Sequence, residues 1–569
     1  MVKKKVETAG SSKKVLVIGL DSATFDIIEP LVQKGQLPNL AKFMLEGSKG
    51  VLQSVLPPLS PQAWASFMTG LNPGRHGVFG FKEKLDSSYS FHFVNNKIIK
   101  SKTLWKFLSE LGKKVVVINI PMTYPPEPVN GILISGMDAP GVSSDFTFPS
   151  EAKEDILKIC PNYYVHLHVA GYLDSDEKRR KAFKDLQWMT DAREKVALHY
   201  LKNYDWDFYA INFAAIDQVQ HHFWRYMADE DQNEFKNCIY DLYKRLDETV
   251  GRLTEDLDDE VTVFIMSDHG AGPISDVVVF IDEWLLSEGL VSFLGRNGKR
   301  GIFKGFVRDF VEGLYDFGVK IAPSNLKDSI QRLLPRFRGK ARSFITQSIV
   351  DWRKTLVYSG ENIGTLRVNL KGRDPNGQVS PDEYKDLLRK IIEKLESLEN
   401  PLTKERLVDK VFFRDELYWG EYVDQSPDLI IWPKENKYRI QKRLFRKGKG
   451  KRAVAIKKRK GVETSGTHRL EGILFAKGPG IRKNTVVPQS YIYDLFPSIL
   501  YAMDLDIPSD LDGKVIKPIF EEEYLKKKQI KFKSYDLNRT GQGKVSEETY
   551  NKEEAEQIEE RLKGLGYLE

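Results

Sequence analysis

The sequence predicts an α/β protein built on an open, mostly parallel β-sheet with helices on both faces and an α/β insertion. Short runs rich in Val and Ile alternate along the chain with longer amphipathic stretches. The runs show little alternation of polar and apolar residues, which is typical of parallel strands buried on both faces. The 569 residues, 41% of them apolar, suffice for one large core with elaborations or for two to three domains.

The elements follow from this pattern in chain order. The expected strands are Val15–Leu20, Lys114–Ile120, Ile132–Ser135, Phe208–Phe213, Val261–Met266, Leu429–Trp432 and Gly472–Phe475. Helical spacing of apolar residues predicts helices over Asp26–Glu46, Asp191–Asn203, Ile302–Ile321, Tyr384–Leu398 and Glu553–Leu565, the last ending at Gly566. A further strand, Leu366–Leu370, is expected to lead into a loop.

Composition shifts divide the chain into five parts. We expect a disordered basic leader over 1–12, a first part of the catalytic core over 13–284, and an insertion over 285–460. The core is expected to resume over 461–520, and 521–569 form a charged tail with a helix. The helix over Ile302–Ile321 is expected to cover the core, and a membrane-surface or lid helix is the alternative.

Charge and cysteine content limit the function classes. Lys and Arg number 87 and Asp and Glu 80, so the formal net charge is +7. Basic residues concentrate in Arg332–Arg342 and Lys437–Lys460, which would suit a solvated loop, a nucleic acid or an anionic membrane. With two cysteines, Cys160 and Cys238, a disulfide-built fold is excluded. No apolar run approaches the roughly 20 residues that span a bilayer, and we expect a cytoplasmic protein.

Carboxylates and imidazoles recur where apolar runs end. Asp21 closes the first strand, Asp268-His269-Gly270 closes another, and Asp217 with His221 follows a third; His468 comes from Gly466-Thr467-His468. These residue types ligate zinc-type divalent cations. Asp217, His221 and His468 are expected to hold one ion, and Asp21, Asp268, His269 and the Ser60 oxygen a second. His222 is the alternative to His221.

Ser60 is the candidate nucleophile. It precedes Pro61, and because proline suits the first helical position, Ser60 is expected to be the N-cap of a helix. A helix N-terminus attracts phosphate oxygens, and a cation on the serine oxygen would make it nucleophilic. Ser66 and Thr69 fall inside the helix and are poorer candidates. Taken alone, Ser60 could simply cap the helix.

With these motifs the chain resembles the alkaline phosphatase superfamily, in the branch of type I phosphodiesterases and nucleotide pyrophosphatases. Matching segments include Gly19-Leu20-Asp21, Ser60-Pro61, Ser267-Asp268-His269-Gly270 and, in the insertion, Val368–Arg373 and Ser426-Pro427-Asp428-Leu429. The resemblance implies an alkaline-phosphatase-like fold and two divalent ions, zinc or alternatively manganese, with Ser60 between them. It also implies a phosphoserine intermediate.

One departure concerns the transition-state donor. Relatives of the nucleotide pyrophosphatase type have a threonine nucleophile followed by an asparagine, whereas here a serine stands and no asparagine occurs before Asn72. Arg75, Lys82 or a backbone N–H would have to replace this donor, so Arg75 and Lys82 are candidate substrate contacts.

Three functions remain open on the sequence. The first is a hydrolase of phosphodiesters or phosphoanhydrides, acting on a nucleotide or another phosphate ester. The second is a phosphomonoesterase or phosphomutase. The third is a non-catalytic protein that binds polyanions.

Overall fold

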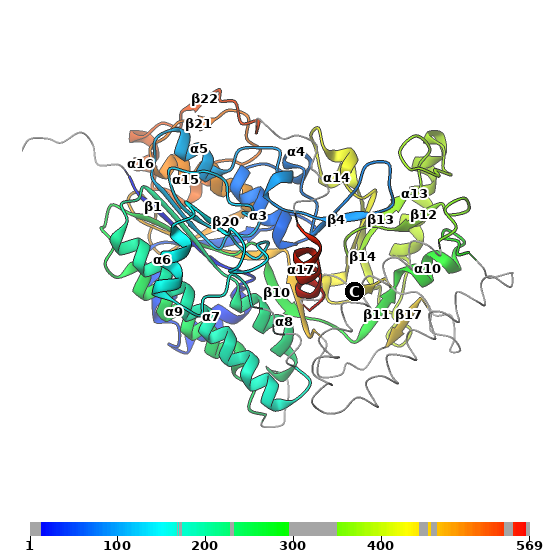
Figure 1. Cartoon of the computed structure of the whole chain (residues 1–569), viewed down its shortest axis with the longest axis horizontal. Helices are drawn as coiled ribbons and strands as arrows, with labels where there is room; N and C mark the ends of the chain where they lie inside the picture. The colour runs from blue at the N-terminus through cyan, green and yellow to red at the C-terminus, as the bar shows by residue number, and fades with distance from the viewer. Residues whose placement is uncertain are drawn as a thin grey trace, which may run out of the picture.

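A nine-stranded sheet forms the centre of the computed structural model, which describes residues 13–167, 169, 173–227, 233–294, 350–442, 453–456, 464–539 and 550–564 (Figure 1). Its spatial order is β20-β2-β19-β9-β1-β8-β5-β6-β7. In that order the strands span Thr485–Tyr491, Ser48–Gln53, Glu471–Lys477, Thr262–Met266, Val15–Leu20, Phe208–Phe213, Val115–Ile118, Gly131–Ile134 and Thr147–Phe148.

The five central strands, β9, β1, β8, β5 and β6, run parallel, and their carboxyl ends therefore share one edge of the sheet. β19 runs antiparallel to both of its neighbours, and β7 runs antiparallel to β6. Every residue of β1, β8 and β9 is buried, which explains why their sequences lack a polar face. The predicted fold class is confirmed.

Helices pack on both faces of this sheet because successive strand residues point to opposite sides. In β1, Leu16 and Ile18 enter one apolar cluster, and Val15 and Val17 enter the other. The first cluster is closed by α1 (Phe25–Gln33), α2 (Pro38–Glu46), α6 (Ala152–Ile159), α7 (Asp176–Asn203), α8 (Ala215–Met227) and α9 (Cys238–Thr254). The second is closed by α3 (Ser60–Thr69), α5 (Leu104–Glu110) and α15 (Leu495–Ala502).

A second unit carries its own apolar cluster. It holds a four-stranded antiparallel sheet, β12-β13-β15-β14, covered by α13 (Pro381–Glu396), and a three-stranded sheet, β16-β11-β17. These strands span Val357–Ser359, Thr365–Val368, Leu429–Pro433 and Val408–Phe413, then Arg439–Gln441, Val277–Phe280 and Val454–Ile456. The cluster begins at β11 and α10 (Ile281–Ser287), upstream of residue 285. The predicted domain boundaries stay predictions.

The remaining elements are short apart from α17. They are α4 (Pro73–His76), α14 (Arg414–Leu417), α16 (Glu522–Lys527) and α17 (Lys552–Gly564), with strands β3 (Lys82–Lys84), β4 (Phe91–Phe93), β10 (Gly270–Pro273), β18 (Gly466–Arg469), β21 (Ile507–Pro508) and β22 (Phe532–Lys533). Single 3₁₀ turns occur at Asn96–Ile98, Val423–Gln425, Lys434–Asn436, Ile492–Asp494 and Lys517–Ile519.

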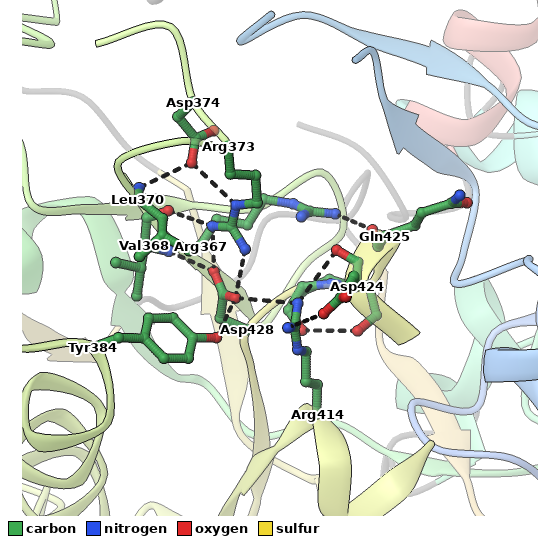
Figure 2. A network of polar contacts seen from close by, with 12 residues as sticks. Arg367, Val368, Leu370, Arg373, Asp374, Tyr384, Arg414, Asp424, Gln425 and Asp428 are labelled. Atoms are coloured by element: carbon green, nitrogen blue, oxygen red, sulfur yellow. Dashed lines mark hydrogen bonds and ion pairs between the residues drawn. The ribbon is translucent and has the colours of Figure 1, made fainter. Parts of the chain in front are cut away.

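A buried ionic network ties the second unit together around Asp428 (Figure 2). Both Asp428 oxygens accept from the Arg373 guanidinium at 2.7 Å, and the backbone N–H of Val368 donates to one of them at 2.7 Å. The Tyr384 hydroxyl donates to the other at 2.5 Å. Burial alone would raise the pKa of Asp428, but Arg373 lowers it, so the carboxylate is charged.

Some local predictions were wrong at the helices. The stretch predicted as one helix, Asp26–Glu46, is two helices, because Gly35 takes a φ of +68° and Pro38 starts α2. The helix predicted from Asp191 begins at Asp176, after the cap Ser175. The predicted helix Ile302–Ile321, the leader, the basic stretch Arg332–Arg342 and most of Lys437–Lys460 lie outside the described residues.

Cys160 and Cys238 are both buried and unpaired. In the part of the chain that the structure describes, no helix is long and apolar enough to cross a bilayer.

Candidate metal centre

Two groups of acidic and histidine side chains meet at the carboxyl edge of the parallel strands. Within each group the potential ligand atoms lie within 4.8 Å of one another, and every member is buried. The first group is Asp217, His221 and His468; the second is Asp21, Asp268 and His269. The rings of His269 and His468 stack with centroids 3.6 Å apart, so the two groups adjoin.

The first group comes from α8, the helix that follows β8, and from a short strand. Asp217 and His221 are four residues apart on α8, and the pitch of the helix places them on one face. His468 lies inside β18, which pairs antiparallel with β10. Asp217 lies in the first turn after β8, as predicted, and His221 one turn further along α8, whereas His468 does not lie at a strand end. Asp217 Oδ1 and His468 Nε2 converge at 3.4 Å.

The second group does come from strand ends. Asp21 directly follows β1, and Asp268 with His269 follows the adjacent parallel strand β9. Adjacent residues on a regular strand would point apart. Here β9 ends at Met266 and β10 begins at Gly270, and the break lets both side chains turn inward. His269 Nε2 lies 3.2 Å from Asp268 Oδ2.

All three imidazoles are oriented by backbone carbonyls. His468 Nδ1 lies 2.6 Å from the Pro58 carbonyl oxygen, His221 Nδ1 lies 3.1 Å from that of Gly466, and His269 Nδ1 lies 3.2 Å from that of Gly270. Because a carbonyl only accepts, each Nδ1 carries the proton, and each Nε2 presents its lone pair to the centre.

These lone pairs make the centre suited to cations. The Nε2 atoms of His221 and His468 lie 3.0 Å apart beside the Asp217 carboxylate, and three such acceptors need a cation or shared protons between them. Asp268 Oδ2 is also buried without a hydrogen-bond donor. Imidazole nitrogens and carboxylate oxygens in two groups of three fit two divalent ions of zinc type.

The electrostatics lead to the same conclusion. Burial and the nearby Asp217 raise the pKa of Asp21 to about 7. Burial, with the charges of Asp21 and Asp217, raises the pKa of Asp268 well above its usual range. Burial would raise the pKa of Asp217 as well, but His221 lowers it well below its ordinary value. Burial, with His468 beside it, lowers the pKa of His269. Three buried carboxylates in one place repel one another unless positive charge is supplied.

Ser60 stands at the second group. Its Oγ lies 3.3 Å from His269 Nε2, and the residue is buried. The prediction that it caps α3 was wrong by one position: Leu59 is the N-cap, and Ser60 is the first helical residue, followed by Pro61. The hydroxyl still lies at the positive end of the helix. Ser66 and Thr69 lie further along α3 and bond to His76 and to the Ala65 carbonyl, respectively.

Two buried residues that the sequence did not single out support Asp21. Asn212, the last residue but one of β8, donates from Nδ2 to Asp21 Oδ2 at 2.8 Å. Arg193, on α7, donates to the backbone carbonyl of Asn212 at 3.2 Å and to that of Val165 at 2.9 Å. Its positive charge favours the charged form of Asp21. In the sequence, the polar residue Asn212 within the otherwise apolar run of β8 was the feature that could have indicated this role.

The candidate substrate contacts are engaged elsewhere. The Arg75 guanidinium pairs with Asp510 at 2.7 Å and with Asp512 at 3.3 Å, so contact with substrate would require it to leave these partners. Lys82 Nζ lies 4.7 Å from the centroid of the Phe93 ring. Both roles stay predictions.

Comparison with known protein families identifies the family to which a chain with this arrangement belongs. The family model of type I phosphodiesterase/nucleotide pyrophosphatase matches residues 15–468, which span both groups. The chain belongs to the type I phosphodiesterase/nucleotide pyrophosphatase family. The resemblance seen in the sequence is thus confirmed, and the protein is a hydrolase rather than a non-catalytic polyanion-binding protein.

Solved structures also match the chain at low sequence identity. Human ectonucleotide pyrophosphatase/phosphodiesterase 5 is 11% identical, with a TM-score of 0.49, and the match covers 90% of this chain and 100% of that one. An inactive variant of the murine protein in complex with AMP is 12% identical, with a TM-score of 0.48 and the same coverage. A comparison with curated proteins returned no match.

Proposed function

We propose that this protein is a two-metal hydrolase that cleaves a phosphodiester or phosphoanhydride through a phosphoserine intermediate on Ser60. The observation that supports this best is the placement of Ser60 Oγ, 3.3 Å from His269 Nε2 and at the start of α3, beside two adjoining groups of buried ligands. The nucleotide substrates for which the family is named fit this chemistry.

When bound, two divalent ions would act as Lewis acids and neutralise charge at the phosphoryl oxygens. Asp217, His221 and His468 would hold one ion, and Asp21, Asp268 and His269 the other. Zinc matches the mixed nitrogen and oxygen ligands, and manganese is the alternative.

The chain itself supplies the nucleophile and its orientation. In the first step the Ser60 hydroxyl loses its proton to solvent and its oxygen forms a bond to phosphorus. The bond from phosphorus to the leaving ester oxygen breaks, and that oxygen takes up a proton from solvent. In the second step a water oxygen bonds to phosphorus, the bond to Ser60 breaks, and the serine recovers its proton. The free first-turn N–H groups of a helix donate to phosphate oxygens, and the Gln62 N–H occupies such a position in α3. It is the backbone donor that would replace the missing asparagine.

The test is hydrolysis of bis-p-nitrophenyl phosphate by the purified protein loaded with Zn²⁺ or Mn²⁺. Ser60→Ala should lower kcat by at least about a thousandfold, because the attacking oxygen is removed. Metal content, measured by elemental analysis, should stay near that of the unchanged protein. The matched control is Ser66→Ala, which removes a buried hydroxyl from the same helix and should retain most of the activity.

Two results would overturn parts of the proposal. Equal activity of Ser60→Ala and the unchanged protein would exclude the serine as nucleophile. Faster turnover of p-nitrophenyl phosphate than of the diester would favour the phosphomonoesterase or phosphomutase alternative.

A further inference from the structure

The C-terminal helix α17 lies beside the candidate nucleophile, although it is outside the stretch matched by the family model. Figure 1 shows it, in dark red, between the central sheet and the second unit. Three of its residues are buried: Ile558, Arg561 and Leu562, spaced three and four apart on one face.

Arg561 anchors the helix to the loop after β6. Its guanidinium donates to the backbone carbonyls of Met137, Ala139 and Pro140, the last two at 3.0 Å. The Tyr550 hydroxyl, just before the helix, donates to the Asp138 carbonyl at 3.1 Å. Because three backbone carbonyls accept from the Arg561 guanidinium, Arg561 holds α17 in one orientation. This orientation determines which residues its apolar face contacts.

That apolar face meets the residues on either side of Ser60. Ile558 and Leu562 form one apolar cluster with Phe81, and Leu59 packs against it. Pro61 lines a partly open cavity whose walls also contain Ile558 and Leu562. The cavity therefore borders the segment that carries the nucleophile.

The topology of the sheet places this cavity at the same edge as the ligand groups. Its walls include Met122, in the loop after β5, and Met137, in the loop after β6. β5 pairs in parallel with β8, which in turn pairs with β1. Neighbouring strands lie about 4.8 Å apart, so these two walls lie two to three strands along the edge from Asp21.

The chemistry of the walls selects an apolar occupant. Phe81, Phe93 and Met137 line it together with Ile558 and Leu562. The polar groups in the lining are engaged: Asp138 accepts from the backbone N–H of Met122 at 3.0 Å and of Tyr124 at 2.5 Å, and Arg561 is held as described. A charged or strongly hydrogen-bonding group would lose its solvation here without gaining partners.

We propose that this cavity binds an apolar ester group of the substrate, with α17 as the wall that determines specificity. The preferred substrate is then a phosphodiester that carries an aromatic or aliphatic group next to the phosphorus. This inference rests on the proposed function, because the phosphorus is placed at Ser60 and the ligand groups.

The experiment measures binding of two phosphonates by calorimetry, without turnover. Methylphosphonate presents the anionic head alone, whereas phenylphosphonate adds a ring that would enter the cavity. The metal-loaded full-length protein should bind phenylphosphonate at least about tenfold more tightly, because the ring leaves water. Ile558→Asn and Leu562→Asn should reduce this ratio towards one, with the affinity for methylphosphonate unchanged.

Two further variants make the result decisive. Ile558→Phe keeps the helix face apolar but fills the cavity, and it should also abolish the preference. Gln557→Ala, on the exposed face of α17, should retain it. Equal affinities for the two phosphonates in the unchanged protein, or a preference that survives all three substitutions at positions 558 and 562, would overturn the inference. Binding of neither phosphonate would overturn the proposed function, and the inference with it.

Discussion

At the scale of single residues, the hydrogen-bond partners of the ring nitrogens distinguish a structural histidine from the candidate metal ligands. His76 uses both ring nitrogens within the protein: Nδ1 accepts from the Val78 backbone at 3.2 Å, and Nε2 lies 2.9 Å from Ser66 Oγ. His269 and His468 also use Nδ1 in this way, but their Nε2 atoms lie within the groups of potential metal ligands.

The state of His76 predicts a pH dependence of stability. Burial lowers its pKa to about 3 in the folded protein, from an ordinary value of about 6.5. The unfolded chain thus binds a proton that the folded protein does not, and stability falls as the pH drops below about 6.5. His76→Gln should remove roughly 2 kcal/mol of the loss between pH 7.5 and 5.0, measured by urea unfolding. An identical loss in both proteins would contradict this assignment.

At the scale of elements, the insertion motifs of the sequence have a structural explanation. Arg373 ends one motif and Asp428 lies in the other, and the fold brings them into a two-pronged ion pair between the loop after β13 and the start of β15 (Figure 2). Tyr384 reaches the same carboxylate from α13. The motifs therefore hold the second unit together rather than contribute to the ligand groups.

Removing the central charge of this network should be costly. Asp428→Asn leaves the mostly buried Arg373 guanidinium without its main counter-charge, and we expect a loss of about 3–5 kcal/mol in urea unfolding. The control is Asp424→Asn, whose side chain is 88% exposed and pairs with Arg414, so the expected change is at most about 1 kcal/mol. Similar effects of the two substitutions would show that burial does not govern this network.

At the scale of the whole molecule, the candidate centre joins segments from Asp21 to His468. Its ligands lie on the ends of β1 and β9, on α8 and on β18, so bound cations would cross-link the core. The residues between β11 and β17 separate His468 in sequence from the other five ligands. After them, β19 returns the chain to the central sheet beside β9.

Cations that bind only the folded state stabilise it by mass action. Treatment with a chelator should lower Tm by several degrees in scanning calorimetry, and restoring Zn²⁺ or Mn²⁺ should reverse the change. The double variant Asp21→Asn, Asp217→Asn should respond little to the chelator. A Tm that is the same with and without chelator in the unchanged protein would argue against resident ions.

The sequence by itself determined the strands, the family and the identities of the clustered residues. Buried parallel strands are recognisable because both faces must be apolar, and a carboxylate that closes such a run, as Asp21 and Asp268 do, is a local signal. Tertiary structure alone decided how these residues meet: that Asp217 and His221 share a helix face, that Asn212 and Arg193 hold Asp21, and that α17 packs beside Ser60. These contacts join residues up to several hundred positions apart, and their geometry depends on how the helices pack against the sheet, which no local pattern encodes.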